Sequence, residues 1–82
     1  MQYELVWSPK IRNKLKKLDK KISLLIIKKI FSIQDNPIPY LKKLKQISHW
    51  RLRVGDYRVV LDLDLANKKI IVLNLGHRKN IY

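Results

Sequence analysis

The chain has 82 residues, among them 19 lysines and arginines against 6 aspartates and glutamates, and its formal net charge of +13 favours a polyanionic partner, either nucleic acid or an acidic protein. The length predicts one domain over residues 1–82, and the absence of cysteine excludes disulfides and cysteine-based zinc sites, so we expect no metal and no cofactor. No apolar run approaches the roughly 20 residues that span a bilayer and no signal peptide opens the chain, which predicts a cytoplasmic protein without a membrane segment.

The first residues predict a short strand followed by a helix. Tyr3, Leu5 and Trp7 stand at alternate positions, the period of a strand with one apolar face. Ser8 and Pro9 come next, and they are typical of an N-cap and of the first helical position. A helix should therefore begin at Pro9.

Apolar residues recur at three- and four-residue intervals from Pro9 to Gln34, with lysines between them, which predicts an amphipathic helical region. Asp19-Lys20-Lys21 interrupts this region without glycine or proline, so one long helix or two are compatible with the pattern, and we favour a helical hairpin. We interpret the helical lysines, Lys14 among them, as a solubilising face. The prolines of residues 35–39 end the helical region, and a connecting loop with Lys42, Lys43 and Lys45 follows.

The second half of the chain has the period of strands. Residues 49–54 and 57–63 flank Gly55-Asp56, which predicts a β-hairpin, and Ala66–Lys69 forms a second turn. The unbroken apolar run of residues 70–75 predicts a central strand buried on both faces. The predicted order is β-α-α-β-β-β, an α+β fold with two N-terminal helices packed on a small antiparallel sheet.

Arginines mark one face of this sheet. Arg51 and Arg53 alternate with apolar residues along the same strand, so both side chains point to one side. Arg58 lies just beyond the turn, and Arg78 with Lys79 follows the glycine that ends the last strand, so we expect three strands to bring basic groups to one surface. These residues form either a phosphate-binding surface or simply the solvated face of the sheet.

Two further side chains could contribute chemistry. His77 is a candidate acid or base because it carries an imidazole, although a histidine at a strand end is commonly structural. Tyr82 could stack on an unpaired RNA base, or it could be a frayed terminus.

The segments Trp50–Val60 and Leu75–Tyr82 resemble the RelE/ParE toxin superfamily, and in particular its RelE-type messenger RNA interferases, in their order of basic hairpin, glycine, arginine and final tyrosine. The Ser8-Pro9-Lys10 helix start and the LKKLK segment at residues 41–45 match as well. The resemblance implies a RelE-like, microbial RNase-like fold and the toxin of a type II toxin–antitoxin system. It also implies a metal-independent endoribonuclease that cleaves messenger RNA in the ribosomal A site by 2′-hydroxyl attack on the adjacent phosphate.

The same resemblance implies partners and residue roles. The partners would be the ribosome with its message and a RelB-type antitoxin, whose complex with the toxin can be a higher oligomer. Arg51 and Arg53 would lie near the attacking hydroxyl, where relatives often have lysine, and Arg58 would contact the scissile phosphate. Arg78 would add charge stabilisation and Tyr82 would stack on a message base.

The chemistry of arginine leaves the general base open. A guanidinium stays protonated far above neutral pH, so it is a poor base at neutral pH. Three alternatives stay open: His77 as the base, a ribosomal group as the base, or a mechanism dominated by positioning and charge stabilisation. Two other functions also stay open: a ParE-like toxin that inhibits DNA gyrase, and a non-catalytic basic RNA-binding relative.

Overall fold

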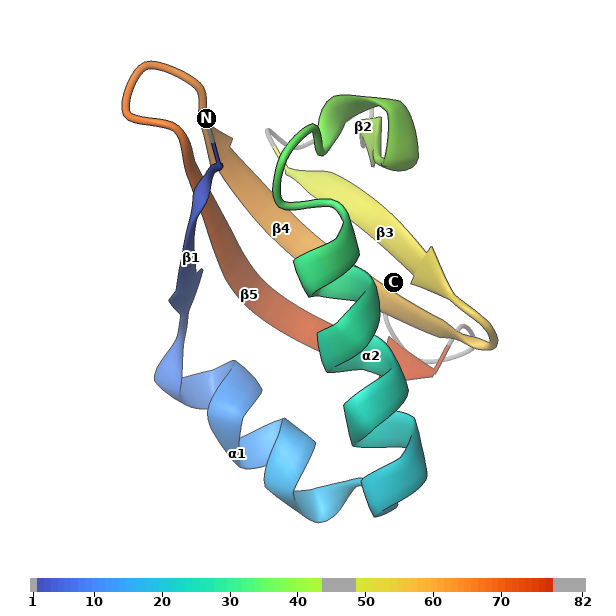
Figure 1. Cartoon of the computed structure of the whole chain (residues 1–82). Coiled ribbons are helices and arrows are strands. Elements are labelled where there is room, and N and C mark those ends of the chain that lie inside the picture. The colour runs from blue at the N-terminus through green and yellow to red at the C-terminus, as the bar shows by residue number, and fades with distance from the viewer. Residues whose placement is uncertain (1, 44–48, 78–82) are drawn as a thin grey trace.

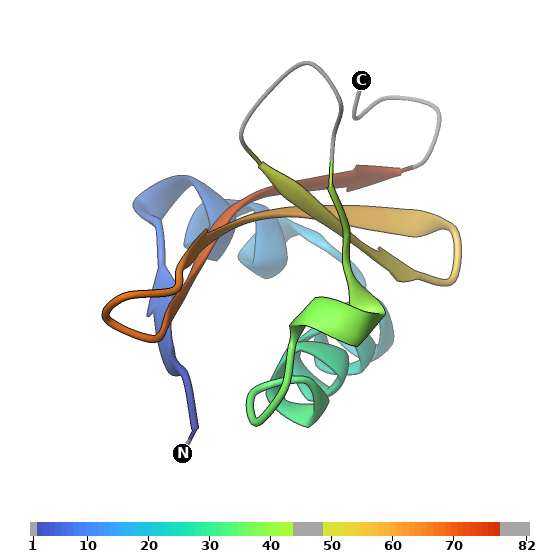
Figure 2. The same cartoon turned by 90° about the horizontal axis from the view of Figure 1, so that it is seen from above.

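A five-stranded sheet carries both α-helices on one of its faces (Figures 1 and 2). The computed structural model describes residues 2–43 and 49–77. The strand order across the sheet is β1-β5-β4-β3-β2. The strands are β1 Glu4–Trp7, β2 Lys42–Lys43, β3 Trp50–Val54, β4 Tyr57–Asp64 and β5 Lys69–His77. We call the face covered by the helices the inner face and the opposite one the outer face.

The α+β fold and the predicted order of elements are confirmed, with two differences in the sheet. β1 pairs with β5 in parallel, so the sheet is mixed rather than antiparallel throughout. A parallel neighbour needs a long crossover, and here the chain between the two strands includes both helices and the β2–β4 region. The segment expected as a connecting loop contributes the two-residue strand β2, which pairs antiparallel with β3.

The helical region forms two helices, α1 Pro9–Lys17 and α2 Lys20–Ser32, which confirms the favoured prediction of a helical hairpin. The Ser8 side chain caps α1 by accepting a hydrogen bond from the Ile11 N–H at 3.2 Å. The break between the helices depends on Asp19, whose carboxylate accepts from the Lys21 N–H at 2.8 Å and so caps a new helix. A 3₁₀ helix, Ile38–Tyr40, follows α2. Neither α1 nor α2, nor any other helix in the described ranges, has the length and apolar character that a membrane span requires.

The core lies between the helices and the inner face of the sheet. Its members are all aliphatic and almost completely inaccessible: Ile11, Ile26, Ile30, Ile33, Leu52, Val54, Val59, Leu61, Ile70, Val72 and Leu75. The prediction that the run 70–75 is buried on both faces was wrong. Ile71 and Leu73 are only partly buried, because both helices pack on the inner face.

A β-bulge in β5 decides which side chains reach each face near its end. Val60 lies opposite Asn74 and Leu61 opposite Val72, so Leu73 is an extra residue on β5. Ser8 supports the bulge, because its N–H donates to the Val72 carbonyl at 3.2 Å and its hydroxyl to the Leu73 carbonyl at 3.1 Å. The extra residue reverses the alternation of all β5 side chains that follow it.

Candidate nucleic-acid interface

The register of the β3–β4 hairpin places three arginines on the outer face. Arg53 lies directly opposite Arg58, and Arg51 lies opposite Val60. Leu52, between the two β3 arginines, is buried in the core, so both arginines point outward. Directly opposite residues have Cβ atoms about 4.5–5.5 Å apart, so the Arg53 and Arg58 side chains start as immediate neighbours.

The turn of this hairpin holds the Arg58 guanidinium. Gly55 adopts a positive φ of +57°, which glycine tolerates at little cost, and the chain reverses there. Nη1 of Arg58 donates to the carbonyls of Gly55 and Tyr57, at 3.4 and 3.2 Å. Both bonds come from one nitrogen, so the other N–H groups of the guanidinium can serve an anion.

Arginines outnumber the acidic side chains on this part of the outer face. Between residues in the described ranges, the one ion pair joins Lys69 to Glu4 at 4.0 Å. It lies on β1 and β5, near the opposite edge of the sheet from β3. Asp62 is on the outer face, two residues along β4 from the partner of Arg51. The end of the hairpin that carries Arg53 and Arg58 also holds one carboxylate, Asp56 of the turn, so it has an excess of positive charge, which suits a phosphodiester.

The third strand of this surface provides space rather than charge. Gly76 of β5 lies opposite Arg58, so Arg53, Arg58 and Gly76 form a row across three strands. Because glycine has no side chain, nothing projects from β5 beside Arg58 at this level. The other predicted site residues, Arg78, Lys79 and Tyr82, lie outside the described residues.

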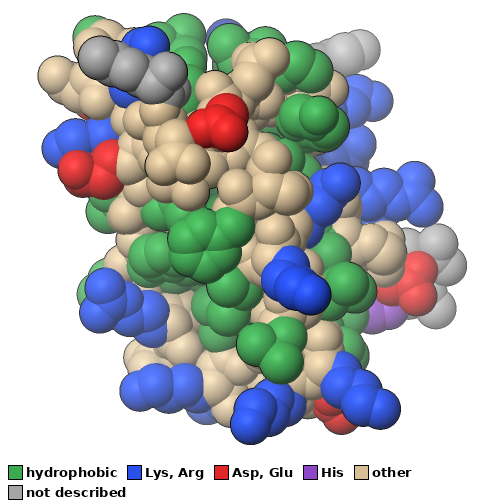
Figure 3. All heavy atoms as spheres, in the orientation of Figure 1, with side chains coloured by type: hydrophobic (Ala, Val, Ile, Leu, Met, Phe, Trp, Pro, Cys, Tyr) green, Lys and Arg blue, Asp and Glu red, His purple; other side chains and the backbone are tan. Residues whose placement is uncertain are grey.

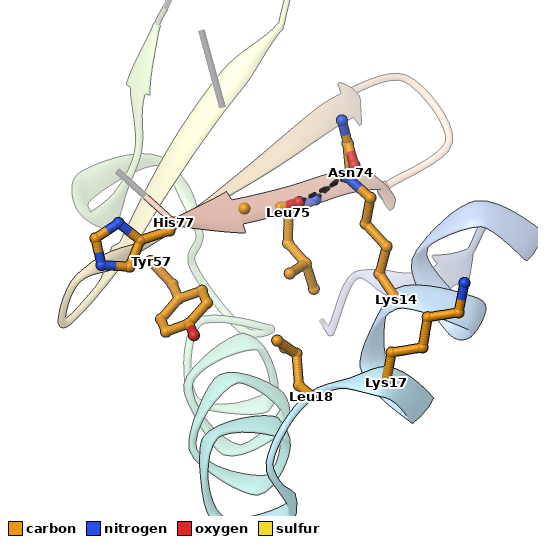
Figure 4. Close-up of a pocket in the computed structure, with 8 residues that line it drawn as sticks. Lys14, Lys17, Leu18, Tyr57, Asn74, Leu75 and His77 are labelled. Carbon is orange, nitrogen blue, oxygen red and sulfur yellow. Dashed lines mark hydrogen bonds between the residues drawn. The ribbon is translucent and has the colours of Figure 1, made fainter. Parts of the chain in front are cut away.

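His77 lies on the inner face, away from the arginines. It pairs with Tyr57, and their rings meet edge to face with centroids 5.6 Å apart. Both line a pocket of about 360 Å³ between β5 and the end of α1, together with Lys14, Lys17 and Leu18 (Figure 4). The structure thus brings Arg51, Arg53 and Arg58 together and separates His77 from them by the thickness of the sheet.

Lys14 is more than a solubilising residue. Its Nζ donates to the Leu75 carbonyl at 3.0 Å, and this bond ties α1 to β5 at the edge of the pocket. Other cations of the helix side lie scattered among hydrophobic side chains (Figure 3). Leu24, Leu25 and Phe31 of α2 are each more than half exposed, at 51%, 57% and 53%. The helix side is therefore partly apolar, whereas the β3–β4 end of the outer face is basic.

Comparison with known proteins places the chain in a family. The model of the ParE toxin of the type II toxin–antitoxin system parDE matches residues 5–82. The chain belongs to this toxin family. No curated protein sequence matches the toxin.

Solved structures share the fold of this toxin. The toxin is similar to a chain in the RelBE2 toxin–antitoxin complex of Mycobacterium tuberculosis, with 22% identity and a TM-score of 0.88 over 95% of this chain and 100% of that one. A chain in the archaeal RelE–RelB complex of Pyrococcus horikoshii OT3 is 24% identical, with a TM-score of 0.83 over 98% of this chain and 99% of that one. A mutant of the E. coli toxin RelE in the free state is 20% identical, with a TM-score of 0.79 over 99% of this chain and 88% of that one. Membership of the RelE/ParE superfamily, expected from the hairpin and the C-terminal segment, is confirmed.

Two polar residues of the toxin have surroundings that could not be predicted from the sequence. Lys42 lies opposite Arg51. The strand that carries it has only two residues, which is too short for a periodic pattern to predict this position. His49 precedes β3, and within the described ranges its Nδ1 is a buried nitrogen without a hydrogen-bond partner. No group of three or more histidine, cysteine, aspartate or glutamate residues is placed to hold a metal ion in the part of the chain that the structure describes.

Proposed function

We propose that this toxin is a ribosome-dependent endoribonuclease that cleaves messenger RNA in the ribosomal A site. The observation that carries the proposal is the outer-face cluster of Arg51, Arg53 and Arg58, in which two arginines lie directly opposite each other. A cluster of planar cations beside Gly76, which has no side chain, suits a phosphodiester of single-stranded RNA.

The proposed reaction uses the RNA's own nucleophile. The 2′-hydroxyl attacks the adjacent phosphorus, the bond to the 5′-oxygen of the next nucleotide breaks, and the products are a 2′,3′-cyclic phosphate and a 5′-hydroxyl. Negative charge grows on the phosphate oxygens in the pentacoordinate transition state. Arg58, held at the turn, and Arg53 beside it would stabilise that charge, and one such donor is typically worth about 10²- to 10³-fold in rate. Arg51 would help to align the attacking ribose.

Proton transfer would not depend on His77. Its side chain shares the inner face with Tyr57, whereas the three arginines are on the outer face. A guanidinium stays protonated at neutral pH, so the arginines are also poor bases. We therefore assign this toxin's contribution to positioning and charge stabilisation, with the ribosome supplying any further acid or base. In the same proposal Arg78 adds a cation, Lys79 contacts RNA, and Tyr82 stacks on a base.

The proposed physiological partner is a RelB-type antitoxin. The M. tuberculosis and P. horikoshii structures that this toxin resembles are toxin–antitoxin complexes. Acidic or amphipathic antitoxin segments would complement a chain of net charge +13 and cover the basic surface in the cytoplasm. The toxin–antitoxin complex would form a higher oligomer.

One observation favours a second function. The matching family model describes a ParE toxin, and the ParE branch of the superfamily inhibits DNA gyrase. The two branches share a fold, so the fold does not decide between them. A third possibility, a basic RNA-binding relative without activity, predicts salt-sensitive RNA binding and no cleavage.

Translating ribosomes distinguish these functions. The purified toxin is added to ribosomes that carry a defined message, and cuts are mapped by primer extension, while a parallel reaction follows DNA supercoiling by gyrase. The proposal predicts cuts confined to the A-site codon and unimpaired gyrase. Intact message with inhibited supercoiling would establish the gyrase function, and intact message with active gyrase would leave the non-catalytic relative.

A further inference from the structure

The short strand β2 separates two neighbouring lysines. Lys42 pairs with Arg51 and Lys43 pairs with Trp50 across the β2–β3 ladder. Paired residues of neighbouring strands share a face, so Lys42 joins the arginines on the outer face. Lys43 lies on the other side, where its Nζ is 5.7 Å from the centroid of the Trp50 ring. Two lysines that are equivalent in sequence thus have different surroundings.

Lys42 creates a second row of cations beside the first. The first row is Arg53 with Arg58, and the second is Lys42 with Arg51, each a pair of like charges directly opposite one another. Two cations directly opposite each other attract an anion more strongly than either one does alone. Among the residues that the structure describes, the ammonium of Lys42 makes no ion pair or hydrogen bond.

The two rows are spaced for two anions rather than one. Arg51 and Arg53 are two residues apart on one strand, which separates the rows by about 6.6 Å. This distance is comparable with the separation of adjacent phosphates in an RNA strand. Beyond the second row, Asp62 of β4 lies diagonally from Arg51 on the same face. Its carboxylate would repel a third phosphate.

We infer that Lys42 and Arg51 form a second phosphate subsite, which holds the phosphodiester next to the one bound at Arg53 and Arg58. The inference rests on the proposed action on RNA and adds the direction in which the RNA strand runs across the sheet. Consecutive phosphates lie along β3, from the hairpin turn towards β2. Lys42 is a binding residue of this subsite, and Lys43 is not.

The salt dependence of RNA binding tests the subsite without requiring cleavage. Affinity for a short single-stranded RNA oligonucleotide is measured over a range of salt concentrations for the toxin and for Lys42→Gln, Lys43→Gln and Lys42→Arg. Removing one cation that binds a phosphate lowers the magnitude of the slope of log K against log salt by about 0.7. Lys42→Gln should show a decrease of about that size, whereas Lys43→Gln and Lys42→Arg should keep the slope of the unchanged toxin. Thermal melts of the three variants check that each is folded.

The outcomes separate this inference from the proposed function. A reduced slope confined to Lys42→Gln supports the subsite even if no message is cut on the ribosome. Equal slopes for Lys42→Gln and Lys43→Gln would overturn the subsite even if cleavage occurs. Binding of the unchanged toxin that does not respond to salt would also overturn it, because a phosphate subsite requires that response.

Discussion

Arg53 and Arg58 lie directly opposite each other across the β3–β4 hairpin, on the face of the sheet that the helices leave uncovered. Like charges in this arrangement oppose folding. Behind them is a well-packed core, since Leu52 and Val59, the neighbouring pair, are almost fully buried. A well-packed strand pair therefore holds two cations side by side, in a position that an anionic ligand makes more favourable.

Removal of one of these charges should stabilise the free toxin. Arg53→Thr should raise the free energy of unfolding in low salt by up to about 1 kcal/mol, because it ends the repulsion across the pair and threonine suits a strand. Thermal or urea unfolding measures the change, and added salt should reduce it by screening the repulsion. Arg53→Lys, which keeps the charge, is the matched control. A gain of the same size in both variants would rule out charge repulsion as its cause.

The hairpin turn should depend on the backbone freedom of Gly55. Gly55→Ala should destabilise the toxin by about 1–2 kcal/mol, because φ is +57° in a region that alanine adopts only at a cost. A Cβ at this position would meet no atom within 4 Å, so the effect is conformational and not a clash. Gly55→Asn should cost less, since asparagine enters this region more readily. Urea denaturation compares the two, and equal losses would point to a contact with the added side chain instead.

His77 should be dispensable for cleavage. His77→Phe keeps an aromatic ring beside Tyr57 and removes the titratable group. Because His77 is on the inner face, the rate of message cleavage and its pH profile should both stay unchanged. A general acid or base would contribute about 10²- to 10⁴-fold. A loss of that size in a folded variant, or a pH profile that loses one limb, would return His77 to the catalytic machinery.

The turn between β4 and β5 makes the free energy of unfolding depend on pH. The Asn67 side-chain amide and N–H donate to Asp64 at 2.9 and 3.1 Å, and these bonds lower the pKa of that carboxyl from its ordinary 3.8. The unfolded chain therefore binds a proton more readily, so this contribution is present above about pH 3.8 and is lost as pH falls through the folded pKa. The difference in free energy of unfolding between the toxin and Asp64→Asn should therefore decrease as the pH falls below about 3.8. Unfolding of both proteins measured at a series of acidic pH values would show this decrease. A constant difference would mean that the charge of Asp64 adds nothing.

Much of the hairpin could be predicted from the sequence because local rules determine it. The alternation of Arg51, Leu52 and Arg53 assigns each side chain to a face, and Gly55 marks the turn that sets the register. Ser8 and Asp19 likewise mark the starts of both helices, although Asp19 is equally compatible with a polar position within one long helix.

The features that escaped prediction depend on contacts between distant segments. Strict alternation from the buried Ile70 and Val72 would place His77 on the outer face with the arginines. The extra residue Leu73 reverses that assignment, and the bulge is supported by Ser8, 65 positions earlier in the chain. The position of Lys42 beside Arg51 has the same origin, since only the completed sheet brings β2 to the edge of β3.

The most direct test of the central claim compares two arginines in the same cleavage reaction. Arg58 is held on the outer face, whereas Arg12 is an exposed residue of α1, so Arg58→Ala and Arg12→Ala remove the same charge from opposite sides of the sheet. Single-turnover cleavage of A-site message should slow by about 10²-fold or more in Arg58→Ala and change little in Arg12→Ala. Equal rates for the two folded variants would contradict the assignment of the outer arginine face as the surface that acts on RNA.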